Sequence, residues 1–233
     1  SFWDRKAETM PRGELEQLQA TRVRSCLERL KASGIEYYRQ RLSDVEPDEF
    51  HSLQDLRSIP FTVKDDLRAH YPFGMFAMPC EHVARIHASS GTTGKPTVVG
   101  YSKRDLDVWA DVMARTLRTA GCRPGMLMQN SFGYGLFTGG IGFHYGAERL
   151  GMTVVPVSGG TTERQVKLIC DFKPDVISVT PSYLLAILDE FRAQGIDPRA
   201  SSLKIAMCGA EPWTNAMREE IEDAFHVHAL DNY

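Results

Sequence analysis

Residues 175–208 read DVISVTPSYLLAILDEFRAQGIDPRASSLKIAMC. Two short runs rich in Val and Ile, residues 175–180 and 203–208, enclose an amphipathic stretch at residues 182–194. Runs of this length and composition are typical of buried strands, and the stretch between them is typical of a helix. The order strand, helix, strand predicts a right-handed βαβ unit with two parallel strands.

The same alternation continues on both sides of this unit. Residues 152–157 form another apolar run, and helices are expected at residues 162–172, opened by a capping box that starts at Thr162, and at residues 214–225. The last residues, 227–233, resemble one more strand that stops at its carboxyl end. We therefore predict an α/β fold, a largely parallel sheet flanked by helices on both faces, with ligand loops at the carboxyl ends of its strands.

The beginning of the chain has a different pattern. Apolar residues recur every three or four positions over residues 12–34, which predicts an amphipathic helix, and residues 42–71 predict shorter helices. Residues 83–87 predict a strand, and residues 102–121 predict a helix that is capped by its first serine. Two parts are expected: an N-terminal helical region, residues 1–78, packed on an α/β nucleotide- and acid-binding core, residues 79–233.

Composition narrows the class of protein. Of the 233 residues, 42% are hydrophobic and 24% are charged, which is enough apolar surface for a packed core and argues against disorder. The 27 basic residues are outnumbered by 30 acidic ones, for a formal net charge of −3. Such a balance offers no broad basic surface, so nucleic acid is not expected as a partner.

The apolar runs and the spacing of cysteine and histidine residues also bear on cellular location and metal binding. No run approaches the roughly 20 apolar residues that span a bilayer, and the start lacks the apolar centre of a signal peptide. The five cysteines form no Cys-x-x-Cys pair, and the seven histidines show no ligand spacing with cysteine or carboxylate. We expect a soluble cytoplasmic protein with reduced thiols, no membrane partner and no metal site.

The most informative motif is Ser89-Ser-Gly-Thr-Thr-Gly-Lys-Pro-Thr97. Small residues allow backbone N–H groups to converge on an anion, hydroxyls add donors, and Lys95 adds a mobile positive charge, so a nucleotide phosphate is the expected ligand. The motif differs from a P-loop because Pro96 follows the lysine, and because residues 97–101 predict a strand where a P-loop has a helix. A flexible Gly/Ser/Thr turn is the alternative.

This motif resembles the phosphate-binding signature of the acyl-adenylating enzymes, and most of the chain resembles the phenylacetate-CoA ligase family within them. The stretches that carry the closer resemblance are residues 2–18, 59–67, 133–140, 144–151, 156–160 and 209–213. The resemblance implies the N-terminal part of the large domain of such an enzyme. It also implies that ATP and an aromatic carboxylic acid form an acyl-adenylate with the help of Mg²⁺, and that coenzyme A then displaces AMP.

The resemblance also implies roles for particular residues. The phosphate loop consists of Ser89, Ser90, Gly91, Thr92, Thr93, Gly94 and Lys95, with Thr93 and Lys95 acting in the chemical step. The other nucleotide-binding residues are Gly209, Ala210, Glu211, Pro212, Asp231, Asn232 and Tyr233. Pro212 is expected to begin a helix, and Glu211 also fits a simple helix N-terminal acid. Asn232 replaces the apolar residue that the family usually has at that position.

The aromatic acid is expected at a segment dense in glycine and aromatic residues, 130–146. The residues assigned to it by the resemblance are Phe132, Tyr134, Phe137, Gly139 and Gly209. Packing of these aromatic rings in the core is the alternative. The pattern Gly133-x-Gly-x-x-x-Gly139 also suggests a dinucleotide fingerprint, but its spacing is wrong, no acidic ribose partner follows, and we expect no clean strand before it or helix after it.

Three expectations concern the whole protein. The resemblance places the Mg²⁺-binding glutamate and the adenylation lysine beyond Tyr233, so this chain alone is expected not to turn over. The protein is also expected to be able to form a homodimer. Two other functions stay open from the residues: a nucleotide- or carboxylate-binding module without turnover, and an α/β oxidoreductase.

Overall fold

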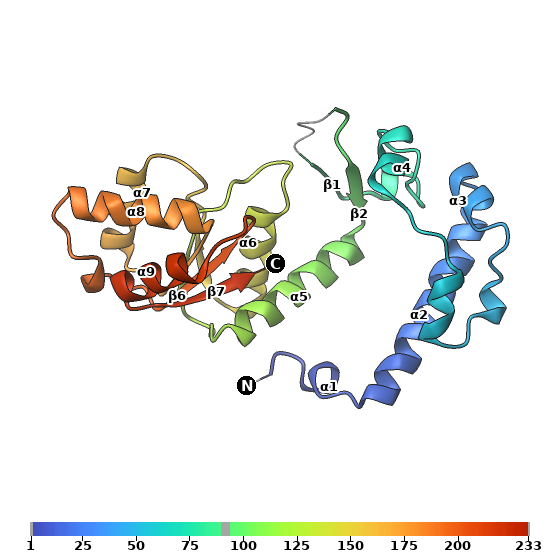
Figure 1. Ribbon diagram of the computed structural model, residues 1–233, viewed down its shortest axis with the longest axis horizontal. Helices are drawn as coiled ribbons and strands as arrows, with labels where there is room; N and C mark the ends of the chain where they lie inside the picture. The colour runs from blue at the N-terminus through green and yellow to red at the C-terminus, as the bar shows by residue number, and fades with distance from the viewer. Residues whose placement is uncertain (1, 90–93, 233) are drawn as a thin grey trace. The chain divides into compact units, whose positions relative to one another are not determined.

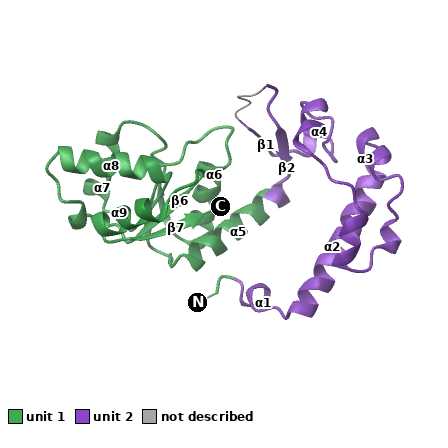
Figure 2. Cartoon of the chain, in the orientation of Figure 1, with its two compact units in different colours: residues 1–3, 106–233 green, residues 4–105 purple. Residues whose placement is uncertain are grey.

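The computed structural model describes residues 2–89 and 94–232 (Figure 1). It divides into two compact units, one formed by residues 4–105 and the other by residues 106–232 with residues 2 and 3 (Figure 2). This division differs from the expected one between residues 78 and 79, because the segment that follows residue 78 packs with the helical region.

The larger unit contains the predicted parallel sheet. Its five strands lie in the order β4-β3-β5-β6-β7, and every neighbouring pair is parallel. The strands are β3 Leu127–Asn130, β4 Thr153–Val155, β5 Val176–Val179, β6 Ile205–Gly209 and β7 His228–Asn232. The α/β prediction is confirmed, including the strand at the end of the described chain.

Helices cover both faces of this sheet. They are α5 Lys103–Thr119, α6 Gly139–Leu150, α7 Thr162–Phe172, α8 Pro181–Ala193 and α9 Asn215–Phe225. Alternate residues of β6 face opposite sides: Ala206 packs in the cluster with α7, α8 and α9, whereas Met207 packs in the cluster with α5 and α6. This alternation explains why the strands are apolar almost throughout, since both faces are buried.

Two elements of this unit were not predicted. Strand β3 ends in Gln129 and Asn130, which are polar but fully buried, and α6 begins with two glycines, Gly139 and Gly140. The expectation that no strand and helix flank the segment at Gly133 was therefore wrong. The incorrect spacing and the lack of an acidic partner still argue against a dinucleotide fingerprint.

Helix caps agree with the sequence in part. Ser102 caps α5, since its Oγ accepts from the Asp105 N–H at 3.2 Å and the Asp105 carboxylate accepts from the Ser102 N–H at 2.8 Å. Helix α7 is capped one residue earlier than expected, by the Thr161 hydroxyl. The expected partner in that capping box, Gln165, is instead fully buried and bonded elsewhere.

The smaller unit joins helices to a hairpin. Its helices are α1 Arg5–Glu8, α2 Arg12–Ala32, α3 Glu36–Arg41 and α4 Lys64–Ala69, with short 3₁₀ turns at Pro47–Glu49, Leu53–Ser58 and Cys80–His82. Strands β1 Arg85–Ala88 and β2 Val98–Tyr101 form a separate antiparallel sheet. A Cβ on Gly100 would lie 2.7 Å from the Phe76 ring, so the hairpin packs tightly on the segment after α4. In neither described unit is there a helix with the length and apolar character needed to cross a membrane.

Candidate functional site

The predicted phosphate loop connects β1 and β2, as expected. Its base is closed by a double link, because the Ser89 N–H donates to the Thr97 carbonyl at 3.0 Å and the Thr97 N–H donates to Ser89 Oγ at 3.0 Å. Ser89 therefore shapes the base of the loop with its own hydroxyl. Gly94 has a φ of +134°, a conformation that side chains rarely adopt.

Lys95 is an exposed cation on this loop. Its Nζ lies 6.0 Å from the centroid of the Tyr71 ring, at the outer limit of a cation–π contact. So weak a contact leaves the ammonium available to a phosphate oxygen. The remaining predicted loop residues, Ser90, Gly91, Thr92 and Thr93, lie outside the described residues, and so does Tyr233.

The second predicted nucleotide segment lies where β6 and β7 end. Gly209 pairs with Asn232, and a Cβ on Gly209 would lie 2.3 Å from the Asn232 carbonyl oxygen, so only glycine fits. Asp231 pairs in the same way with Cys208. Burial and the nearby Asp231 carboxylate raise the pKa of the Cys208 thiol to about 12, so this thiol stays protonated beside the site.

The chain turns sharply after Gly209. Ala210 adopts the left-handed conformation, with a φ of 70°, which is uncommon for a residue with a Cβ. Glu211 Oε1 then accepts from the Ser182 N–H at 2.7 Å, so this carboxylate caps the beginning of α8. Pro212 does not begin a helix, because α9 starts at Asn215 with Thr214 as its cap.

The predicted acid-binding residues occupy two different environments. Phe132 is only 8% exposed and stacks on Phe143, with ring centroids 5.5 Å apart. Gly139 lies against the Phe132 ring, since a Cβ on this glycine would be 3.9 Å from it. Phe137 is 57% exposed, on the turn before α6. The structure thus brings Phe132 and Gly139 together within unit 106–232 and leaves Phe137 facing outward.

Tyr134 is half-buried, less buried than Phe132 and less exposed than Phe137. Its hydroxyl accepts from Asn130 Nδ2 at 2.7 Å and lies 3.0 Å from His144 Nδ1. Burial is the main cause that raises the pKa of Tyr134 above its ordinary value of 10.0, so the hydroxyl keeps its proton. His144 Nε2 in turn lies 3.1 Å from Glu148 Oε1.

A second buried network supports the same end of β3. Gln165 Oε1 accepts from Gln129 Nε2 at 2.7 Å and from Ser131 Oγ at 2.8 Å, and Gln165 Nε2 donates to the Ser158 carbonyl at 2.9 Å. Ser158 has a φ of 65°, and its N–H donates to the Asn130 carbonyl at 3.0 Å. The loops after β3 and after β4 are therefore linked to α7 and to each other by buried amides that the sequence did not single out.

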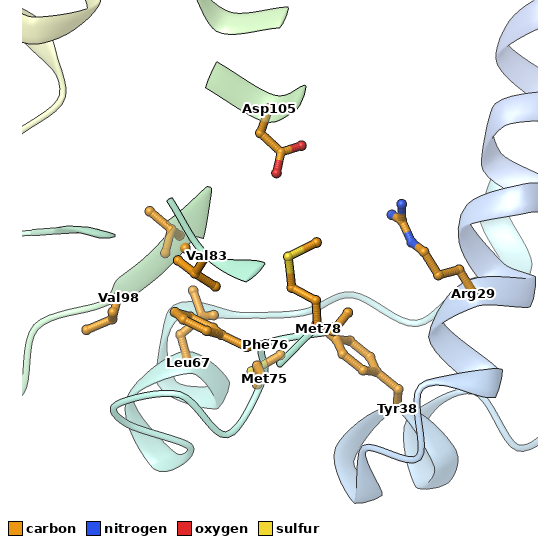
Figure 3. Close-up of a pocket in the computed structure, with 12 residues that line it drawn as sticks. Arg29, Tyr38, Leu67, Met75, Phe76, Met78, Val83, Val98 and Asp105 are labelled. Atoms are coloured by element: carbon orange, nitrogen blue, oxygen red, sulfur yellow. The ribbon is translucent and has the colours of Figure 1, made fainter. Parts of the chain in front are cut away.

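The described residues hold no candidate metal site, and one cavity lies away from the predicted site residues. Residues 2–89 and 94–232 contain no group of three His, Cys, Asp or Glu side chains that could hold a metal ion. A cavity of about 320 Å³ lies in the smaller unit (Figure 3). Its lining is mostly apolar, with Arg29 and Asp105 as the charged residues, and none of the described predicted site residues lines it.

Comparison with known proteins places the chain in a family. Residues 13–233 match the model of the AMP-binding enzymes. A phenylacetate-coenzyme A ligase of Thermus thermophilus is 57% identical over 97% of this chain and 51% of its own length. One from Aromatoleum evansii is 57% identical over 89% of this chain and 49% of its own length.

A solved structure supports the same assignment. The crystal structure of 2-hydroxyisobutyryl-CoA ligase in complex with its acyl-adenylate and CoA matches with a TM-score of 0.92 at 29% identity. The match covers 99% of this chain and 51% of that chain. The chain spans about half the length of the curated relatives it matches. It belongs to the family of AMP-binding enzymes.

Proposed function

We propose that the chain is the ATP- and acid-binding part of an AMP-forming acid–thiol ligase that acts on an aromatic carboxylic acid. The observation that carries the proposal is the 57% identity, over 97% of the chain, to a relative named phenylacetate-coenzyme A ligase. In the proposed reaction the acid carboxylate attacks the α-phosphorus of ATP, which gives an acyl-adenylate and pyrophosphate. The thiolate of coenzyme A then attacks the acyl carbon, and AMP leaves as the thioester forms.

The described residues suit the first step in three ways. Lys95 is an exposed cation on a loop whose small residues can turn backbone N–H groups toward phosphate oxygens, where negative charge develops. Gly209 and Ala210 form a sharp turn at the carboxyl ends of parallel strands, which is where ligands bind in open α/β sheets. The segment from Phe132 to Phe137 adds apolar rings for an aryl group.

Mg²⁺, coenzyme A and the substrate acid belong to the proposal as well. Bound Mg²⁺ would neutralise negative charge on the triphosphate, and the described residues provide no cluster of ligands for it. Asn130, Ser158 and Gln165 hold the loops around the acid segment through hydrogen bonds. Rigid loops of this kind keep the acid oriented toward the nucleotide.

The proposal is tested by acid-dependent ATP–pyrophosphate exchange in the complete protein that contains these residues. Lys95→Ala should lower kcat/KM for ATP on the order of 10²-fold, because it removes a positive charge from the phosphates. Lys167→Ala is the matched control, since Lys167 is a surface residue of α7 that pairs with Asp171. An unchanged kcat/KM for ATP in Lys95→Ala would remove Lys95 from the reaction.

A further inference from the structure

A directed chain of hydrogen bonds links the end of β3 to helix α6. It runs from Asn130 to the Tyr134 hydroxyl at 2.7 Å, from there to His144 Nδ1 at 3.0 Å, and from His144 Nε2 to Glu148 Oε1 at 3.1 Å. His144 and Glu148 are four residues apart, so they lie on one face of α6. The two rings of Tyr134 and His144 meet nearly at right angles, at 84°.

The surroundings of Asn130 fix the direction of this chain. Its side-chain amide is buried between the Gly140 carbonyl, which can only accept, and the Phe132 N–H, which can only donate. The Nδ2 group therefore faces the carbonyl at 2.6 Å and Oδ1 faces the N–H at 3.4 Å. The second Nδ2 proton goes to the Tyr134 oxygen.

The tautomer of His144 follows from its contact with Glu148. A carboxylate oxygen only accepts, so His144 Nε2 carries the proton that Glu148 Oε1 accepts, and Nδ1 of the neutral ring is then an acceptor. The Tyr134 hydroxyl, which accepts from Asn130, therefore donates its proton to His144 Nδ1. Both ring nitrogens are occupied by protein groups, so His144 has no nitrogen left for substrate.

Tyr134 is also held through its backbone. Its N–H donates to Ser158 Oγ at 3.3 Å, and the Ser158 N–H donates to the Asn130 carbonyl at 3.0 Å. The loop after β3 is thus tied to the loop after β4 by its main chain and to α6 by a side chain. Gly133 and Gly135 flank Tyr134, and Gly135 has a φ of 146°, so the side-chain contact compensates for a backbone of high conformational freedom.

We propose that His144, held by Glu148, is a positioning residue for substrate: by accepting the Tyr134 hydroxyl at Nδ1 it fixes the loop that receives the aromatic acid. The inference rests on the proposed function, which assigns the segment from Phe132 to Phe137 to the acid. It assigns His144 an influence on acid binding and none on ATP binding or on the chemical step.

Two substitutions of the same residue separate this role from a general effect on α6. An asparagine side chain reaches the position of the Nδ1 atom, so His144→Asn keeps an acceptor for Tyr134 and loses the contact with Glu148. A glutamine side chain reaches the position of Nε2, so His144→Gln keeps the contact with Glu148 and loses the acceptor. Tyr134→Phe removes the same hydrogen bond from the other side, together with the one that Asn130 Nδ2 donates to the hydroxyl.

The readout is acid-dependent ATP–pyrophosphate exchange in the complete protein, with phenylacetate as the acid. His144→Gln and Tyr134→Phe should each raise KM for phenylacetate about three- to tenfold, the usual worth of one hydrogen bond. The KM for ATP should stay within twofold, and His144→Asn should stay closer to the unmodified protein than His144→Gln does. Adding His144→Gln to Tyr134→Phe should change KM no further, because Tyr134→Phe already removes the hydrogen bond that His144→Gln removes.

Several outcomes would overturn the inference. Equal KM values for phenylacetate in His144→Asn and His144→Gln, with melting temperatures lowered alike, would show a structural role only. Nitrogen NMR of the labelled protein gives an independent check, and a neutral His144 protonated on Nδ1 would contradict the hydrogen-bond chain. Absence of phenylacetate-dependent exchange in the unmodified protein would defeat the proposed function itself, whereas normal exchange with an unaltered KM in His144→Gln would defeat this inference alone.

Discussion

Replacing Gly209 by alanine tests the geometry at the end of β6. The new Cβ would lie 2.3 Å from the Asn232 carbonyl oxygen, whereas ordinary contact begins at 3.4 Å. The two strands would have to separate by about 1 Å at their paired ends, and overpacking of this kind costs about 1–3 kcal/mol. Because the next residue, Ala210, already has a φ of 70°, the turn has little room to absorb the shift.

Thermal unfolding and ATP kinetics of the complete protein measure the effect. Gly209→Ala should lower the unfolding midpoint by several degrees and should also raise KM for ATP, since Gly209 and Ala210 at the displaced strand end are predicted to bind the nucleotide. Gly13→Ala is the control, because a Cβ there meets nothing within 4 Å on helix α2 and alanine favours a helix. A Gly209→Ala protein with an unchanged midpoint would refute the close approach of the two strands.

Three further results are expected. Burial alone would raise the pKa of Asp175, but hydrogen bonds from Lys204 Nζ and the Leu127 N–H together outweigh burial and hold the pKa below 3.8. The stability that this carboxylate contributes is therefore present above about pH 4 and is lost as the pH falls below it. Asp175→Asn should therefore lower the melting temperature at pH 7 and flatten its acid dependence. Burial raises the pKa of the thiols of Cys122 and Cys208 to about 11 and about 12, so iodoacetamide should label the exposed cysteines of the folded protein and spare these two, as peptide mass analysis would report. Phe137→Ala should reduce the preference for phenylacetate over acetate in exchange assays, and an unchanged ratio would remove this ring from the acid site.

The sequence predicted the elements whose patterns are local. The strands β4, β5, β6 and β7 are short apolar runs, and α7, α8 and α9 have helical spacing, so each is visible within its own residues. Strand β3 was missed because its buried Gln129 and Asn130 resemble loop residues. Their burial depends on partners 36 and 48 residues away, Gln165 and Ser178, which no local pattern reveals.

The same limit applies to the site. Glycine and hydroxyl residues indicated the phosphate loop. The fold places Gly209 beside Asn232, and both were predicted to bind the nucleotide. Helix α6 was missed because glycines open it, and without the helix the four-residue spacing of His144 and Glu148 carries no meaning. Had α6 been predicted, that spacing would have indicated the contact.

Product analysis of the complete protein tests the central claim most directly. With ATP, phenylacetate and coenzyme A, the proposed chemistry predicts equal amounts of AMP, pyrophosphate and phenylacetyl-CoA, with no AMP formed when the acid is omitted. Formation of ADP and phosphate, or nucleotide cleavage that does not depend on an aromatic acid, would contradict it.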